Sequence, residues 1–127
     1  MPEMPNEKPD FKMVRRIGLA FPGVEESTSF GQPALKFKGK VFACMASHHS
    51  AEPGSLVVRI DFDRRGELLA DAPEIYYLTD HYVGYSGVLA RLAKIQPDAL
   101  RGLLAGALEF VRVAARKRAA PKTTRRR

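Results

Sequence analysis

The sequence predicts an α+β domain in which helices near both ends of the chain cover one face of an antiparallel sheet of about five strands. Three observations support this fold class. Apolar residues recur at helical spacing near both ends of the chain. Short apolar and β-branched runs, separated by glycine turns, fill the middle. The chain has 127 residues, 45% of them hydrophobic and 28% charged, which suits one globular domain.

Three helices are predicted from caps and apolar stripes. Asp10 can cap a first helix that ends near Ala20. Asp63 can cap a short helix through Ala70, between two strands. The last helix begins near Pro97, which suits a first turn. Its apolar face is the clearest helical signal in the chain and consists of Leu100, Leu103, Leu104, Ala107, Leu108 and Val111.

The strands are predicted from apolar runs bounded by turns. Gln32–Phe37 and Val41–Ser47 flank Lys38-Gly39-Lys40, and this pattern predicts a β-hairpin. Three further strands are predicted at Ser55–Ile60, Ile75–Leu78 and Gly87–Ala93, with a loop over 80–86, although Val88–Leu92 also fits a helix by periodicity alone. We expect the helix-free face of this sheet to be solvated, with alternating polar positions.

The positive charge is concentrated at the C-terminal end. Residues 112–127 hold 8 of the 21 Lys and Arg residues and no Asp or Glu, which leaves 13 basic and 14 acidic residues elsewhere. The net charge of +7 therefore comes from this end. We expect a flexible N-terminus over 1–9, one domain over 10–116 and a basic, disordered tail over 117–127.

Cysteine usage and hydropathy predict a cytoplasmic protein. The single cysteine, Cys44, cannot form a disulfide within the chain. The first residues lack the basic and apolar regions of a signal peptide. No apolar run approaches the length of a membrane span, so we expect no membrane partner. A monomer is favoured.

No pattern of catalytic or metal-binding residues is present in the sequence. His48 and His49 would point to opposite sides of an extended segment, and no Cys-x-x-Cys or helical His pair occurs. The run Gly84-Tyr85-Ser86-Gly87-Val88 lacks the second glycine of a nucleophile elbow. Cys44 is expected to be a small buried strand residue. The sequence therefore predicts a protein that is not an enzyme and has no metal or cofactor.

A set of short motifs extends across the chain. They are Phe21-Pro22-Gly23-Val24-Glu25-Glu26-Ser27, Phe30-Gly31-Gln32-Pro33-Ala34-Leu35-Lys36, Gly39-Lys40-Val41-Phe42-Ala43, His81-Tyr82-Val83-Gly84-Tyr85 and Val88-Leu89-Ala90-Arg91-Leu92. In this order they resemble the MmcQ/YjbR family, over about residues 10–115. The resemblance implies a fold like that of the bacterial frataxin homologue, with terminal helices on one face of an antiparallel sheet. It also implies DNA binding, because members of the family are described as DNA-binding proteins.

Strand parity predicts cations on the helix-free face of the sheet. Lys36, Arg59 and Arg91 alternate with apolar residues in three different strands, so they should share one face. Lys38 and Lys40 lie at the predicted hairpin tip. A spread cationic surface of this kind fits phosphate contacts. The same residues also fit an ordinary solvated sheet face.

The loop before the last strand is aromatic. Tyr82 and Tyr85 could stack on unpaired bases, or they could close the end of the core with their hydroxyls in water. The candidate nucleic-acid-binding residues are therefore Lys36, Lys38, Lys40, Arg59, Arg91, Tyr82, Tyr85, Arg112, Arg116, Lys117, Arg118, Lys122, Arg125, Arg126 and Arg127.

The sequence thus predicts a protein that binds DNA or another polyanion, largely without sequence preference. The alternative is a small interaction or ligand-binding module. A contiguous positive sheet face would favour nucleic acid, and a deep, mainly apolar pocket under Tyr85 would favour a ligand.

Overall fold

The computed structural model describes residues 10–119 of the chain and, for residues 117–119, the backbone alone. Within this range the predicted α+β class is confirmed. The elements are α1 (Phe11–Leu19), β1 (Val24–Ser29), β2 (Gln32–Phe37), β3 (Lys40–Met45), β4 (Ser55–Arg59), α2 (Phe62–Asp71), β5 (Tyr76–Tyr77), the 3₁₀ turn η1 (Asp80–Tyr82), β6 (Gly87–Arg91) and α3 (Pro97–Ala119). None of the helices in this part of the chain is long and apolar enough to cross a membrane.

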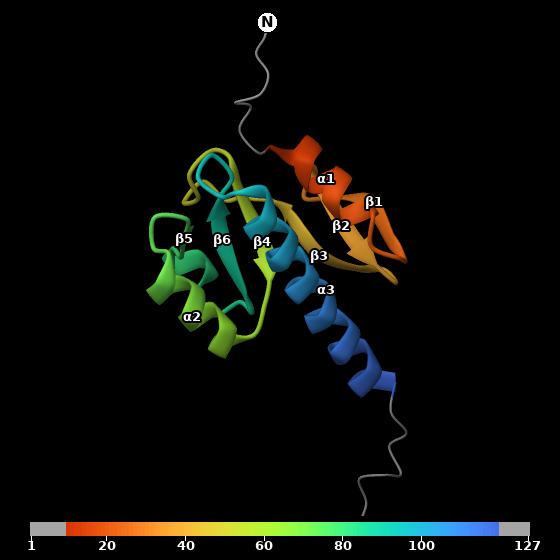
Figure 1. Cartoon of the computed structure of the whole chain (residues 1–127). Coiled ribbons are helices and arrows are strands. Elements are labelled where there is room, and N and C mark those ends of the chain that lie inside the picture. The colour runs from red at the N-terminus through yellow and green to blue at the C-terminus, as the bar shows by residue number, and fades with distance from the viewer. Residues whose placement is uncertain (1–9, 120–127) are drawn as a thin grey trace, which may run out of the picture.

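The strands form one antiparallel sheet in the order β1-β2-β3-β4-β6-β5. Helices α1 and α3 cover one face, and α2 lies near the β5 edge (Figure 1). The sheet has one strand more than the five expected. Strand β1 was not predicted, because its residues, Val-Glu-Glu-Ser-Thr-Ser, show no apolar alternation. Charged residues suit this position, since they discourage an edge strand from pairing with another chain.

Two similar turns join the first three strands. In the β1–β2 turn, φ is 52° at Phe30 and 79° at Gly31. In the β2–β3 turn, φ is 50° at Lys38 and 81° at Gly39. Positive φ at both central residues is typical of the type I′ turn, whose twist matches that of the flanking strands. Phe and Lys are unfavourable at the first position, because left-handed backbone costs a residue with a Cβ about 1–2 kcal/mol.

The main core lies between the sheet and the helices. The whole apolar face predicted for the last helix is buried, with no member more than 6% exposed. Leu35, Leu56 and Val88 contribute to this core from the sheet. A β-bulge in β3 directs both Phe42 and Ala43 into the same core.

Acidic caps begin the first two helices. Asp10 caps α1 as predicted and accepts a hydrogen bond from the Met13 N–H at 3.3 Å. The prediction that Asp63 caps the second helix is wrong. Asp61 is the cap and accepts from the Arg64 N–H at 2.7 Å, which places Asp63 in the first turn. A carboxylate in the first turn is still favourable, because the helix dipole is positive there.

The helix-free face of the sheet is not solvated at its centre, contrary to expectation. Val57 and Leu89 lie on this face with only 7% and 0% of their surface exposed. Tyr82 of η1 packs against them, and Cys44 and Tyr77 adjoin the same cluster. The run Leu56-Val57-Val58 is apolar at both parities, which is typical of a strand buried on both faces. This second, smaller core fixes the aromatic loop against the sheet.

Candidate functional site

Lys36, Arg59 and Arg91 occupy the strand positions that alternate with the residues facing the helices, as strand parity predicted, but their charges do not form a continuous patch. Arg59 pairs with Gly87 at one end of the β4–β6 ladder, and Arg91 pairs with Ser55 at the other. The Arg59 guanidinium lies 5.3 Å from the centre of the Tyr85 ring and 5.1 Å from that of Phe110. Aromatic rings hold this charge in place.

Lys36 lies two strands further along the sheet and already has an acidic neighbour. Its Nζ is 3.9 Å from a carboxylate oxygen of Glu25, across the β1–β2 ladder. The lysine side chain is 34% exposed and the glutamate 71% exposed. Such exposed pairs contribute about 0–1 kcal/mol, so Lys36 is accessible but partly neutralised.

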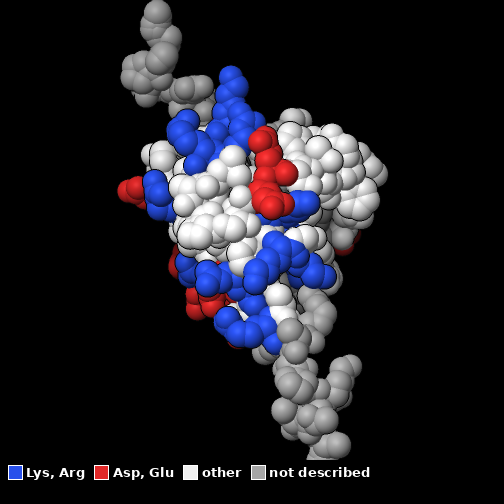
Figure 2. All heavy atoms as spheres, turned by 90° about the vertical axis from the view of Figure 1, so that its right-hand side faces the viewer, with Lys and Arg blue, Asp and Glu red and all other residues white. Residues whose placement is uncertain are grey.

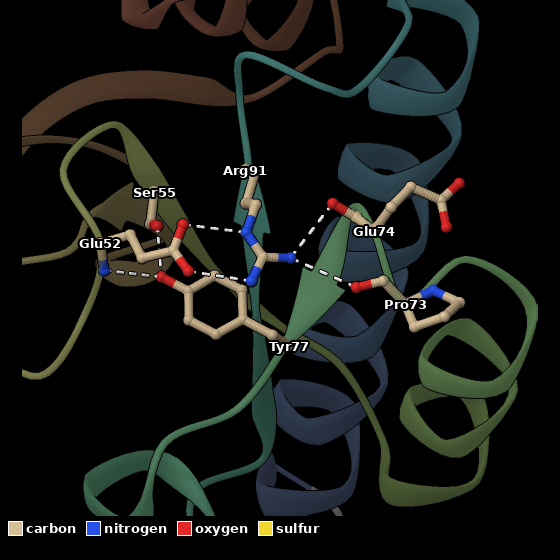
Figure 3. A network of polar contacts seen from close by, with 6 residues as sticks. All are labelled: Glu52, Ser55, Pro73, Glu74, Tyr77 and Arg91. Atoms are coloured by element: carbon tan, nitrogen blue, oxygen red, sulfur yellow. Dashed lines mark hydrogen bonds and ion pairs between the residues drawn. The ribbon is translucent and has the colours of Figure 1, made fainter.

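Arg91 forms the densest polar network of the helix-free face (Figure 3). Its Nε and Nη2 both donate to the Glu52 carboxylate at 2.9 Å. Its Nη1 donates to the carbonyl oxygens of Pro73 at 3.2 Å and Glu74 at 3.1 Å. The guanidinium also lies 4.2 Å from the centre of the Tyr77 ring. Arg91 therefore joins three segments of the fold.

The hydrogen-bonded ion pair of Arg91 and Glu52 shifts the pKa of both groups. The hydrogen bonds to Glu52 raise the pKa of Arg91, and the same bonds lower the pKa of Glu52. The backbone N–H of Glu52 donates to the Tyr77 hydroxyl at 2.8 Å, which holds the backbone of the loop at Glu52 in place. Because the charge of Arg91 is balanced here, the described part of the chain has no contiguous positive sheet face.

A different group of the predicted basic residues does come together. Lys38 from the β2–β3 turn and Arg112 and Arg116 from α3 line one cleft around Phe37. The Lys38 ammonium is 5.6 Å and the Arg112 guanidinium 5.8 Å from the centre of the Phe37 ring. Lys40 pairs with Phe37 across the hairpin. We use the name basic cleft for this cleft together with the four cations at it, Lys38, Lys40, Arg112 and Arg116. Figure 2 shows basic side chains gathered on this side of the molecule, around the C-terminal part of α3.

The basic cleft keeps most of its charge. Arg116 lies 3.9 Å from a carboxylate oxygen of Glu109, in a pair with both side chains well exposed. Within residues 10–116, no acidic side chain forms an ion pair with Lys38, Lys40 or Arg112. The other predicted cations of this end fall outside the described side chains, namely Lys117, Arg118, Lys122, Arg125, Arg126 and Arg127.

A pocket of about 300 Å³ opens on the helix-free face. Tyr82 and Tyr85, the predicted aromatic residues, both line it. The remaining lining residues were not predicted as site residues, namely Ser29, Phe30, Val41, Cys44, Ser47, Val57 and His81. They come from β1, β3, β4 and three loops, and only the fold brings them together. We call this set of nine residues the aromatic pocket.

The aromatic pocket has no acidic or strongly basic side chain in its lining. None of its lining residues is Lys, Arg, Asp or Glu. Burial raises the pKa of the Cys44 thiol and of the Tyr82 and Tyr85 phenols, so all three groups stay protonated at neutral pH. A mainly apolar hollow beside Tyr85 is the feature that favours a ligand-binding module.

All three histidines of the chain form one stack beside the aromatic pocket. The ring centres of His48 and His81 are 3.5 Å apart, and those of His48 and His49 are 4.3 Å apart. The expectation that His48 and His49 point to opposite sides is wrong, because the chain turns here instead of extending. Burial and then the neighbouring histidines lower the pKa of His48. Among the described residues, no group of three or more His, Cys, Asp or Glu side chains could hold a metal ion.

These features define a small α+β domain with terminal helices on a six-stranded antiparallel sheet, a basic cleft at one end and an aromatic pocket on the open face. Residues 19–109 match the YjbR family, and the protein belongs to that family. The resemblance seen in the sequence motifs is thereby confirmed.

A solved structure supports the fold. The crystal structure of Deinococcus radiodurans protein DR2400, with a DUF419 domain, is similar with a TM-score of 0.66 and 20% sequence identity. The similarity covers 82% of this chain and 79% of that chain. No curated protein matches the sequence.

Proposed function

We propose that the protein is a non-enzymatic, nucleic-acid-binding protein that contacts phosphates through the basic cleft and the adjoining C-terminal cations. The observation that carries this proposal is the convergence of Lys38, Arg112 and Arg116 around Phe37. Two elements far apart in the sequence meet there, and both contribute cations. The proposal moves the site from the sheet face to this end of the molecule. As expected from the sequence, we propose that the protein acts as a monomer in the cytoplasm.

The geometry suits a phosphate backbone better than base edges. Arg112 and Arg116 are four residues apart on α3, so they lie on one helix face. Their planar guanidinium groups can each bind a phosphate through two hydrogen bonds. Lys38 contributes a point charge from the β2–β3 turn. Contacts of this kind fix position without reading sequence, and we therefore expect nonspecific binding.

The cations after Arg116 should add much of the affinity. The rest of the chain is nearly neutral, so long-range attraction to phosphate depends on this end. Each contact with duplex DNA contributes a slope of about −0.9 to the log–log dependence of affinity on salt. About four contacts from the tail would therefore contribute about −3.6. A chain that ends at Arg116 should lose most of this slope.

The test is a titration of duplex and single-stranded DNA at several salt concentrations. The double variant Arg112→Gln/Arg116→Gln should weaken binding and make the salt slope shallower by about 1.8, the share of two contacts. The matched control is Lys94→Gln/Arg101→Gln, which removes the same charge from two exposed positions, one in the turn before α3 and one in its second turn. The control should keep the slope, because Arg101 lies about 22 Å along the helix from Arg116.

Two results would contradict the proposal. If both double variants weaken binding equally, the effect is one of net charge and the basic cleft is not the site. If the full chain binds DNA more weakly than about 100 µM at physiological salt, its affinity is below the usual nonspecific range and the nucleic-acid function is wrong.

A further inference from the structure

The aromatic pocket is distinct from the basic cleft in both place and chemistry. It lies on the helix-free face, where the smaller core of Val57, Tyr82 and Leu89 supports it. The cations at the basic cleft attract phosphate, whereas the aromatic pocket has no Lys, Arg, Asp or Glu in its lining. We infer that the aromatic pocket binds a small, uncharged, planar aromatic molecule. This inference goes beyond nucleic-acid binding and does not depend on it.

The size and polarity of the aromatic pocket define the ligand class. Its volume of about 300 Å³ lies at the small end of ligand sites, which suits one fused ring system. No Lys, Arg, Asp or Glu lines the aromatic pocket to offset the hydration that a charged group would lose there. The hydroxyls of Ser29 and Ser47 and the imidazole of His81 supply a few hydrogen-bonding partners at the edges. A neutral ring with one or two polar atoms satisfies both requirements.

The wall formed by Tyr85 is held in place before any ligand binds. The Tyr85 ring packs directly over Gly87, where an added Cβ would lie 2.8 Å from a ring carbon. The Arg59 guanidinium is near the same ring. Arg65 donates a hydrogen bond to the Tyr85 carbonyl at 2.9 Å. A preformed wall lowers the entropy lost on binding, which favours a real site over an incidental hollow.

Phe30 is the residue that the fold itself does not explain. It occupies the first central position of a type I′ turn with φ of 52°, where Asn or Gly is preferred. Phe30 is 90% exposed, so it contributes little to the core. Yet Phe30 lines the mouth of the aromatic pocket. Backbone strain combined with an exposed aromatic ring at a pocket indicates a binding role for that ring.

Indole is a suitable probe, because it is neutral, planar and bicyclic. The chain contains no tryptophan, so the fluorescence of indole can be followed without interference from the same chromophore in the protein. We expect saturable binding of indole, and binding of indole-3-acetate at least tenfold weaker. Chemical shifts should change for residues of the aromatic pocket, and not for those of the basic cleft.

Three variants test the assignment. Phe30→Asn should weaken indole binding about fivefold, the value of one aromatic contact. Ser47→Phe should fill the aromatic pocket and abolish binding. The control is Leu19→Ala, which removes a 41% exposed apolar side chain from α1, outside the aromatic pocket, and should leave binding unchanged.

Several outcomes would overturn the inference. One is the absence of saturable indole binding, and another is equal affinity for indole and indole-3-acetate. Unchanged binding by both Phe30→Asn and Ser47→Phe would show that indole binds elsewhere. Displacement of indole by single-stranded DNA would assign the aromatic pocket to nucleic acid. The Arg112→Gln/Arg116→Gln variant should bind indole normally, so failure of one proposal does not affect the other.

Discussion

The Phe30→Asn substitution should raise stability while it lowers ligand binding. Phe30 has a left-handed backbone, which costs a residue with a Cβ about 1–2 kcal/mol, and Asn tolerates this conformation well. Because Phe30 is 90% exposed, removal of its ring should lose little packing. The free energy of unfolding should therefore rise by about 1 kcal/mol. In a domain of this size, the melting temperature should rise by about 4 °C.

Thermal and urea unfolding, followed by circular dichroism, measure this change. The β2–β3 turn supplies an internal control, since Lys38 has nearly the same φ of 50°. Lys38→Asn should stabilise the protein to a similar extent and leave indole binding intact, but it should weaken DNA binding. Phe30→Ala should reduce indole binding without the gain in stability, because Ala keeps the backbone strain. If Lys38→Asn stabilises the protein and Phe30→Asn destabilises it, the ring of Phe30 supports the fold and the strain argument is wrong.

Three further outcomes are expected. Arg91 lowers the pKa of Glu52 below its ordinary value of 4.5, so the stability that this pair provides is present above that pH and is lost as the pH falls through the folded pKa. Glu52→Gln should flatten this dependence in urea titrations between about pH 3 and 6. Cys44 should react slowly with a thiol reagent under native conditions, because burial raises its pKa, and rapid labelling would contradict this. Gly87→Ala should lower the free energy of unfolding in urea by about 1–3 kcal/mol, since its Cβ would lie 2.9 Å from the Val58 carbonyl oxygen. Gly84→Ala, whose Cβ would meet open space, should leave this free energy nearly unchanged.

The parts of the fold that the sequence predicted correctly are those with strong periodicity. Helix α3 has an unbroken apolar face, and α1 has a capping aspartate at its start. The hairpin around Lys38-Gly39 has a turn residue suited to positive φ. Strand β1 escaped prediction because an edge strand needs few apolar side chains. Its pairing with β2 depends on backbone hydrogen bonds, which any sequence can make.

The candidate site was harder to predict than the fold. Strand parity placed Lys36, Arg59 and Arg91 at the correct alternate positions of the sheet. Parity does not show which acidic side chains form ion pairs with them. Glu52 is 39 residues before Arg91 in the chain, and its position depends on the path of an irregular loop. The aromatic pocket combines three loops and three strands, so no local pattern could reveal it. The one available signal was Phe30 before Gly31, an aromatic residue where a hairpin turn prefers Asn.

The distribution of ion pairs explains why the number of cations alone does not show where the protein surface is positive. Several basic side chains of the folded body have an acidic partner, in the pairs Arg15–Glu26, Lys36–Glu25, Arg64–Glu67 and Arg91–Glu52. Each pair cancels its own field beyond a short distance, because opposite charges a few ångströms apart act as a dipole in screened solvent. The basic cleft lacks such cancellation over most of its residues, and the basic C-terminal sequence follows it directly. A polyanion approaching the protein would therefore be drawn to the C-terminal end of α3, and the aromatic pocket, which no Lys or Arg lines, would contribute little to that attraction.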